Sequence, residues 1–225
     1  MIPDPAVNIW THTKNSLYPL YEERARGSAP EMDCHAQAAE IYAAYQQPGD
    51  RLLDAGGGSG YFYWSLKRRG LLGRYHLLDQ TADFVAMARR ALGAELPPES
   101  FIWSSIQETP GRYAAVFCLN ALFCLPDYRQ GLERLLLAAE RVVIIRSTFA
   151  ERQEIRYETD AYLDPGAGRL KSYFNIWSMA EVTAFMESYG FAVHTVVDRR
   201  TNDQPEISAG KPFPWRWLVG VRPGI

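Results

Sequence analysis

The sequence predicts an α/β fold with a doubly wound, mostly parallel sheet of seven strands, an antiparallel hairpin at its C-terminal edge and a helical cap at its N-terminus. From residue 50 onward, short apolar runs alternate with segments of helical periodicity, as in a parallel sheet with crossover helices. A glycine cluster joins the first run to the helical segment after it. The last two runs, 191–197 and 215–221, are joined by residues without helical periodicity, which favours an antiparallel pair.

The N-terminal region is expected to be helical. Residues 8–46 are rich in aromatic side chains and are interpreted as mostly helical, and Gln47-Pro48-Gly49 then ends the region. We therefore expect an N-terminal cap over residues 1–49 and a second domain over residues 50–225 that contains the whole sheet.

The first three strands are expected at 51–55, 75–78 and 101–103. The helix between the first two covers 60–69 and ends at Gly70, because glycine favours the position after a helix C-terminus. The next helix begins at Thr81, a residue type common at helix N-caps, and its apolar residues recur at the i, i+3, i+4, i+7 spacing of one helix face.

Two further strands, at 114–119 and 141–146, flank a helix that Pro126-Asp127 opens. Residues 149–175 show no clear period and carry many charges, so we expect them to leave the sheet as an excursion. Ser178-Met-Ala-Glu181 has the pattern of a capping box and marks the start of a helix before the terminal hairpin.

The composition argues against several classes of protein. The chain has 225 residues, a formal net charge of -2 and 22% charged residues, which does not fit a protein with a basic nucleic-acid-binding face. Its three cysteines, Cys34, Cys118 and Cys124, lack the spacing of a disulfide framework or a metal site. No apolar run has the length of a membrane span. We expect a cytoplasmic protein without a metal, with a homodimer kept open as its assembly.

The glycine cluster is Asp54-Ala-Gly56-Gly-Gly58-Ser-Gly60, directly after the first expected strand. A dinucleotide-binding fingerprint requires a third glycine where this chain has Tyr61 in one register and Tyr63 in the other. A phosphate-binding Walker loop requires a Gly-Lys-Ser/Thr sequence that does not follow here. Both of these nucleotide-binding interpretations therefore fail.

The cluster resembles the first motif of class I S-adenosylmethionine (SAM)-dependent methyltransferases, Asp/Glu-x-Gly-x-Gly-x-Gly. Asp79, at the end of the second expected strand, stands where that family places its ribose-binding carboxylate. Residues 119–127 look like the family's fourth motif, and the terminal hairpin matches its last two strands. The resemblance covers roughly residues 50–221 and implies the Rossmann-like methyltransferase fold.

The resemblance implies SAM as the cofactor. The residues expected to contact it are Asp54, Gly56, Gly58, Gly60, Asp79, Gln80, Ser105, Ile106 and Asn120, with Trp10 and Tyr18 as residues of a lid. Bare glycine backbone lets the cofactor approach the loop amides, and a carboxylate can accept from both ribose hydroxyls. Two positions depart from the family pattern. Ser105 or Gln107 would have to replace the acidic side chain with which the family usually contacts the adenine. The family often has a histidine where this chain has Cys124.

The implied activity is transfer of a methyl group from SAM to an oxygen or nitrogen of a small molecule, such as a sugar or another secondary metabolite. The segment 174–178 also looks loosely like methyltransferase-like proteins of bacterial polysaccharide pathways. A hydroxyl acceptor would require a general base, for which His12, Tyr157 and Asn175 are the candidates. The alternative is a non-catalytic SAM-binding subunit that stabilises or regulates a partner.

Overall fold

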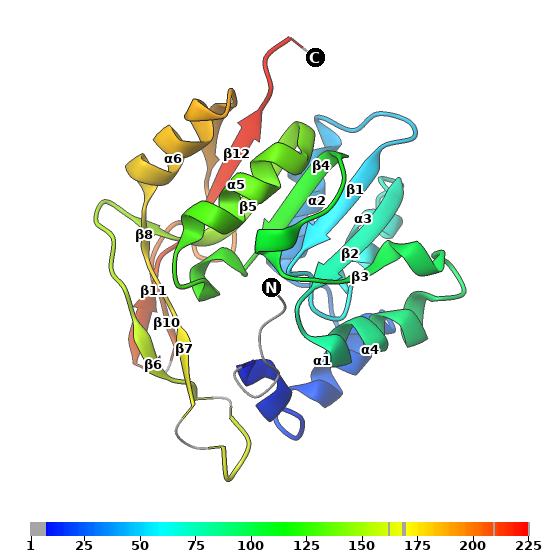
Figure 1. Cartoon of the computed structure of the whole chain (residues 1–225), viewed down its shortest axis with the longest axis vertical. Helices are drawn as coiled ribbons and strands as arrows, with labels where there is room; N and C mark the ends of the chain where they lie inside the picture. Colours follow the sequence, from blue (N-terminus) through cyan, green and yellow to red (C-terminus); the bar gives the residue numbers. More distant parts are fainter. Residues whose placement is uncertain (1–7, 162, 168–169, 209, 225) are drawn as a thin grey trace.

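The computed structural model describes residues 8–161, 163–167, 170–208 and 210–224. Its centre is a mixed sheet with the strand order β3-β2-β1-β4-β5-β12-β9 (Figure 1). The strands of this sheet are β1 (Arg51–Ala55), β2 (Arg74–Asp79), β3 (Phe101–Trp103), β4 (Tyr113–Leu119), β5 (Ala139–Ala150), β9 (Ala192–Val196) and β12 (Trp215–Val221). Strands β1 to β5 are parallel, and β12 runs antiparallel between β5 and β9. The predicted doubly wound sheet with an antiparallel C-terminal pair is confirmed.

Helices cover both faces of the sheet. They are α1 (Tyr18–Ala25), α2 (Asp33–Ala43), α3 (Phe62–Arg68), α4 (Ala82–Leu92), α5 (Tyr128–Ala138) and α6 (Met179–Ser188), with short 3₁₀ turns η1 (Ile9–His12), η2 (Pro98–Ser100), η3 (Ile106–Glu108) and η4 (Leu122–Cys124). Among the described residues, no helix combines the length and apolarity that crossing a membrane requires.

Side-chain caps fix the start of α5 and α6. Asp127 accepts a hydrogen bond from the backbone N–H of Arg129, and Ser178 accepts one from the backbone N–H of Glu181, which confirms the predicted helix start at Ser178. Thr81 precedes α4 as predicted, but its side chain makes no cap bond. Its hydroxyl instead accepts from the Asn8 side-chain amide at 3.1 Å, so this residue ties the N-terminal segment to the sheet.

Two apolar clusters form the core of the protein. One contains Tyr42 of α2, Phe62 of α3 and Phe117 of β4, and Phe117 makes edge-to-face contacts with both other rings. The other contains Leu132 of α5 and Trp177 of β8 (Trp177–Ser178). Helix α2 thus belongs to the sheet's own core, while the division of the chain at residue 49 stays a prediction.

Two segments expected to be irregular contain short strands. The excursion 149–175 begins as an extension of β5 and then forms a hairpin of β6 (Tyr157–Thr159) and β7 (Lys171–Tyr173). A second hairpin pairs β10 (Glu206–Ser208) with β11 (Lys211–Phe213), and β8 adds an eighth strand beside β5. Strands of two or three residues are too short to show a period of two in the sequence. Figure 1 shows both hairpins together on one side of the sheet, away from α1 and α4.

Candidate functional site

A cavity of about 240 Å³ lies where β1, β2 and β4 end, the edge of an open parallel sheet at which ligands bind. Seven of the residues predicted to contact a cofactor line it: Trp10, Gly56, Gly58, Asp79, Gln80, Ile106 and Asn120. The N-terminal segment covers this edge and is anchored to it, because the Ser59 hydroxyl donates to the carbonyl of Tyr21 at 2.8 Å. The structure therefore brings most of the predicted site together.

The glycine loop allows a close approach at two positions. Gly56 has a φ of 72°, and a Cβ there would lie 2.6 Å from the Cβ of Ala121. Gly58 has a φ of 58°, and its missing side chain leaves space in front of the Tyr21 ring, which also lines the cavity. The amides of both glycines are already used, by the carbonyl of Leu78 and by Asp79. These two glycines thus offer bare backbone surface rather than the hydrogen-bond donors expected from the sequence.

Asp79 is the buried carboxylate of the site. One of its oxygens accepts from the amide of Gly58 at 2.9 Å, and the other accepts from the amide of Thr81 at 2.8 Å. Burial raises the pKa of Asp79, and these two hydrogen bonds, together with one from the Thr81 hydroxyl, oppose that effect. Asp79 also lines the cavity, so the acceptor capacity that its carboxylate retains is available to the hydroxyls of a bound ligand.

Asp54 and Gly60 lie outside the cavity wall and support the loop. The Asp54 carboxylate accepts from the hydroxyl of Tyr75 at 2.5 Å, and a Cβ on Gly57 would lie only 2.3 Å from it. Burial raises the pKa of Asp54 to about 7. Gly60 packs against Leu92 of α4. Both residues therefore support the shape of the loop and do not line the cavity, although they were expected to contact the cofactor.

Ser105 and Tyr18 lie beside residues of the cavity wall. The Ser105 hydroxyl is buried and has no hydrogen-bond partner within the described ranges, and Ile106 next to it lines the cavity. Tyr18 packs on Phe84, with ring centroids 5.3 Å apart, and donates its hydroxyl to Asp83 at 3.0 Å. Tyr18 therefore supports the wall from behind, whereas the Trp10 ring reaches it.

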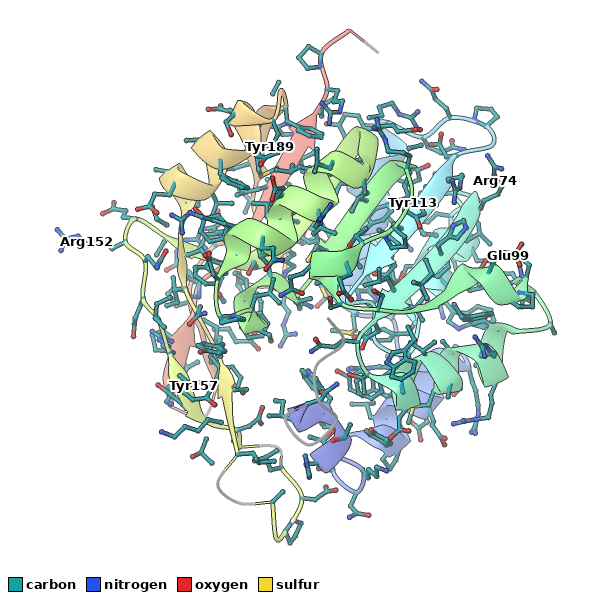
Figure 2. The ribbon with its side chains drawn as sticks, viewed as in Figure 1. Arg74, Glu99, Tyr113, Arg152, Tyr157 and Tyr189 are labelled. Atoms are coloured by element: carbon teal, nitrogen blue, oxygen red, sulfur yellow. The ribbon has the colours of Figure 1, made fainter. Side chains whose placement is uncertain are left out.

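The three candidates for a general base do not line the cavity. His12 borders a separate outer hollow with Asp164. Tyr157 is 51% exposed on the β6–β7 hairpin, where Figure 2 places it at the outside of the molecule. Asn175 is fully buried, and its side-chain amide bonds the carbonyl of Leu125 and the backbone N–H of Arg156. That pattern is typical of a structural asparagine.

Several wall residues lie outside the predicted motifs. Tyr21 and Arg24 of α1 both line the cavity, as does Tyr61 after the glycine loop. The Arg24 guanidinium lies 5.9 Å from the centre of the Tyr21 ring and 5.4 Å from that of Tyr61. His35 stacks on the far side of Tyr61, and burial lowers its pKa to about 3, so it is neutral. The three-residue spacing of Tyr21 and Arg24, which places them on one helix face, was the available signal.

No protein-family model matches the sequence, and no curated protein matches it. Several solved structures resemble it. Magnesium protoporphyrin IX methyltransferase ChlM from Synechocystis PCC 6803, with bound SAM, aligns with a TM-score of 0.61 at 18% identity, over 99% of each chain. The CcbJ methyltransferase from Streptomyces caelestis gives 0.63 at 14% identity, over 94% of this chain and 98% of its own. The glycopeptide N-methyltransferase MtfA, complexed with sinefungin, gives 0.57 at 14% identity, over 85% and 95%. The chain therefore has the fold of class I SAM-dependent methyltransferases.

Proposed function

We propose that this protein is an enzyme that transfers a methyl group from SAM to an oxygen or nitrogen atom of a small molecule. The observation that carries the proposal is the pairing of Asp79 with the Gly58 amide at the end of β2, inside a cavity that α1 covers. This arrangement offers a carboxylate for a ribose diol beside backbone that has no Cβ. The shared fold of SAM-bound methyltransferases supports it.

The residues present fit each part of the cofactor. Asp79 would bind the ribose hydroxyls, and Gln80 and Ile106 would flank the adenine, since both line the cavity near the end of β2. The buried, unpartnered hydroxyl of Ser105 would accept from the adenine amino group. Arg24, which lines the cavity and lies over the Tyr21 and Tyr61 rings, would bind the carboxylate of the amino-acid end.

Catalysis would rest on alignment. SAM supplies an activated methyl group, so the protein has to hold the acceptor atom in line with the methyl carbon and the sulfur. Among the described wall residues, Tyr21, Tyr61 and Cys124 have pKa values that burial raises, so they stay protonated at neutral pH. The cavity thus favours an acceptor that arrives as an unprotonated amine or as an already ionised group and needs no general base.

Two measurements test the proposed function. SAM and S-adenosylhomocysteine (SAH) should each raise the melting temperature, because a ligand that binds only the folded state stabilises it, whereas NAD should not. Radiolabelled SAM should also transfer its methyl group to the small-molecule fraction of a metabolite extract. Binding of SAH without any transfer by the chain alone would favour a non-catalytic SAM-binding subunit. A response to NAD but not to SAH would reject the proposal.

Arg24→Gln is expected to weaken SAH binding about tenfold or more, because a charge-assisted hydrogen bond to the cofactor carboxylate is lost. Calorimetric titration of SAH into both proteins measures the effect. The matched control is 5′-methylthioadenosine, which lacks the amino-acid end and should bind the parent and the variant alike. An equal loss for both ligands would mean that Arg24 shapes the cavity through its rings instead.

A further inference from the structure

Four aromatic rings form a cluster beside the cavity, which we call the aromatic shelf: Phe123, Phe174, Phe213 and Trp215. They come from η4, the residue after β7, the end of β11 and the start of β12. The Phe123 ring meets Trp215 edge-on with centroids 5.3 Å apart, and Phe213 stacks on Trp215 at 6.1 Å and 16°. Phe174 lies 6.2 Å from both Phe123 and Phe213. Segments far apart in the sequence thus converge on one aromatic surface.

The shelf is not part of the core that holds the fold together. Each of its four side chains is only half-buried, and none of them belongs to either apolar core cluster. Grouped aromatic rings that remain partly open to solvent are typical of binding surfaces. The hairpin β10–β11, which contains Phe213, and the hairpin β6–β7, which Phe174 follows, lie together on this side of the sheet (Figure 1).

Polar contacts fix the Trp215 ring of the shelf. The indole N–H of Trp215 donates to Glu206 at 2.9 Å. The Arg146 guanidinium lies 4.4 Å from the centre of the Trp215 ring and is itself held by a buried ion pair with Asp198 at 2.5 Å. A ring fixed in this way gives a preorganised surface, which loses little conformational entropy when a ligand binds.

Phe123 joins the shelf to the cavity, because it packs against Trp215 and also lines the cavity. The wall next to Phe123 is apolar and consists of Leu119, Ala121, Cys124 and Leu125. The polar group there is Asn120, and its carbonyl oxygen already accepts from Arg146 at 2.5 Å. A sugar on this surface would leave several hydroxyls without partners, which is costly in a dry site. A flat apolar ring has no such hydroxyls and would leave no polar group without a partner.

We propose that the aromatic shelf is the acceptor subsite and that the acceptor is a flat, apolar ring system rather than a sugar. This inference rests on the proposed methyl transfer and deepens it. A ligand with its ribose on Asp79 and its adenine near Ile106 occupies the β2 side of the cavity, which leaves the β4 and β5 side, where Phe123 lies, for the acceptor. Packing against Phe174 and Phe213 would then bring the acceptor's reactive edge toward the cavity that Phe123 lines.

The test compares two probes on the SAH-saturated protein by equilibrium dialysis: 2-naphthol, a flat apolar ring, and D-glucosamine, a sugar. We expect 2-naphthol to bind at least about tenfold more tightly. Phe174→Ala and Phe213→Ala should each weaken its binding about tenfold while SAH affinity stays unchanged. The matched control is Ile207→Ala, because Ile207 is an exposed apolar residue on the same hairpin as Phe213. This substitution should change the affinity for neither ligand by more than about twofold.

Two results would overturn the inference: equal binding of the two probes, or 2-naphthol affinity that is the same in the parent, Phe174→Ala and Phe213→Ala. SAH binding by each variant shows that the variant is folded. A variant that loses 2-naphthol binding but keeps SAH binding therefore supports the inference. A parent protein that binds no SAH would refute the proposed function instead. The dialysis is then repeated without SAH, and the same comparison of variants still decides whether the shelf binds flat rings.

Discussion

Asp79→Ala is expected to weaken SAH binding by at least about a hundredfold. The substitution removes the acceptor of two hydrogen bonds from the ribose hydroxyls, and bonds to a charged group are worth about 1.5–3 kcal/mol each. It also leaves the amides of Gly58 and Thr81 without their partner beneath the loop. The melting temperature of the ligand-free variant should therefore fall as well. Calorimetric titration of SAH and thermal unfolding measure the two effects.

Two variants isolate the contribution of the Asp79 carboxylate. Asp79→Asn keeps the shape and one acceptor but places an N–H₂ group opposite a backbone amide, so its affinity should lie between those of the parent and the alanine variant. Asp83→Ala removes a carboxylate nearby whose partners are Tyr18 and Lys14, and it should leave SAH affinity nearly unchanged. If the Asp79 and Asp83 variants bind SAH equally well, the ribose assignment is wrong.

The fold could be predicted largely from local patterns. Alternating apolar runs and helical segments gave the parallel strands, and the capping box at Ser178 marked the start of α6 where the structure has it. The two hairpins could not be found, because strands as short as Tyr157–Thr159 and Glu206–Ser208 are stabilised by pairing with distant residues rather than by their own periodicity. Thr81 shows the same limit, since its hydroxyl bonds Asn8 instead of its own helix.

The residues of the site that lie at the ends of strands could be predicted from the sequence. Gly56, Gly58 and Asp79 meet because parallel strands end at one edge of the sheet. Wall residues from elsewhere, such as Arg24, depend on how α1 packs across that edge. The spacing of Tyr21 and Arg24 shows that they share a helix face but not what that face covers. The sequence also could not show that Asn175 is buried with its side-chain amide hydrogen-bonded. Its polar side chain therefore suggested a catalytic role, whereas in the structure it is a structural residue.

Asp54→Asn is expected to stabilise the ligand-free protein at pH 8. Burial raises the pKa of Asp54 from 3.8 to about 7, so the folded protein binds this proton more tightly than the unfolded chain. Ionising the carboxylate therefore lowers the free energy of unfolding as the pH rises from about 4 to about 7, and the full loss is present above that. Asparagine cannot ionise, so the gain should approach a few kcal/mol at pH 8 and vanish near pH 4.

Asp50→Asn, immediately before the same strand, should have the opposite effect. Burial favours the neutral form of Asp50, but hydrogen bonds from Arg141 and Tyr42 outweigh it and lower the pKa below its usual value. Its carboxylate thus stabilises the fold above the unfolded pKa and loses that contribution in acid. Urea unfolding of the parent and both variants at pH 4.5 and pH 8 measures the signs. If Asp54→Asn is also destabilising at pH 8, the ionised carboxylate is held by its Tyr75 hydrogen bond more strongly than burial opposes it. Asp54 would then be a charged support of the glycine loop.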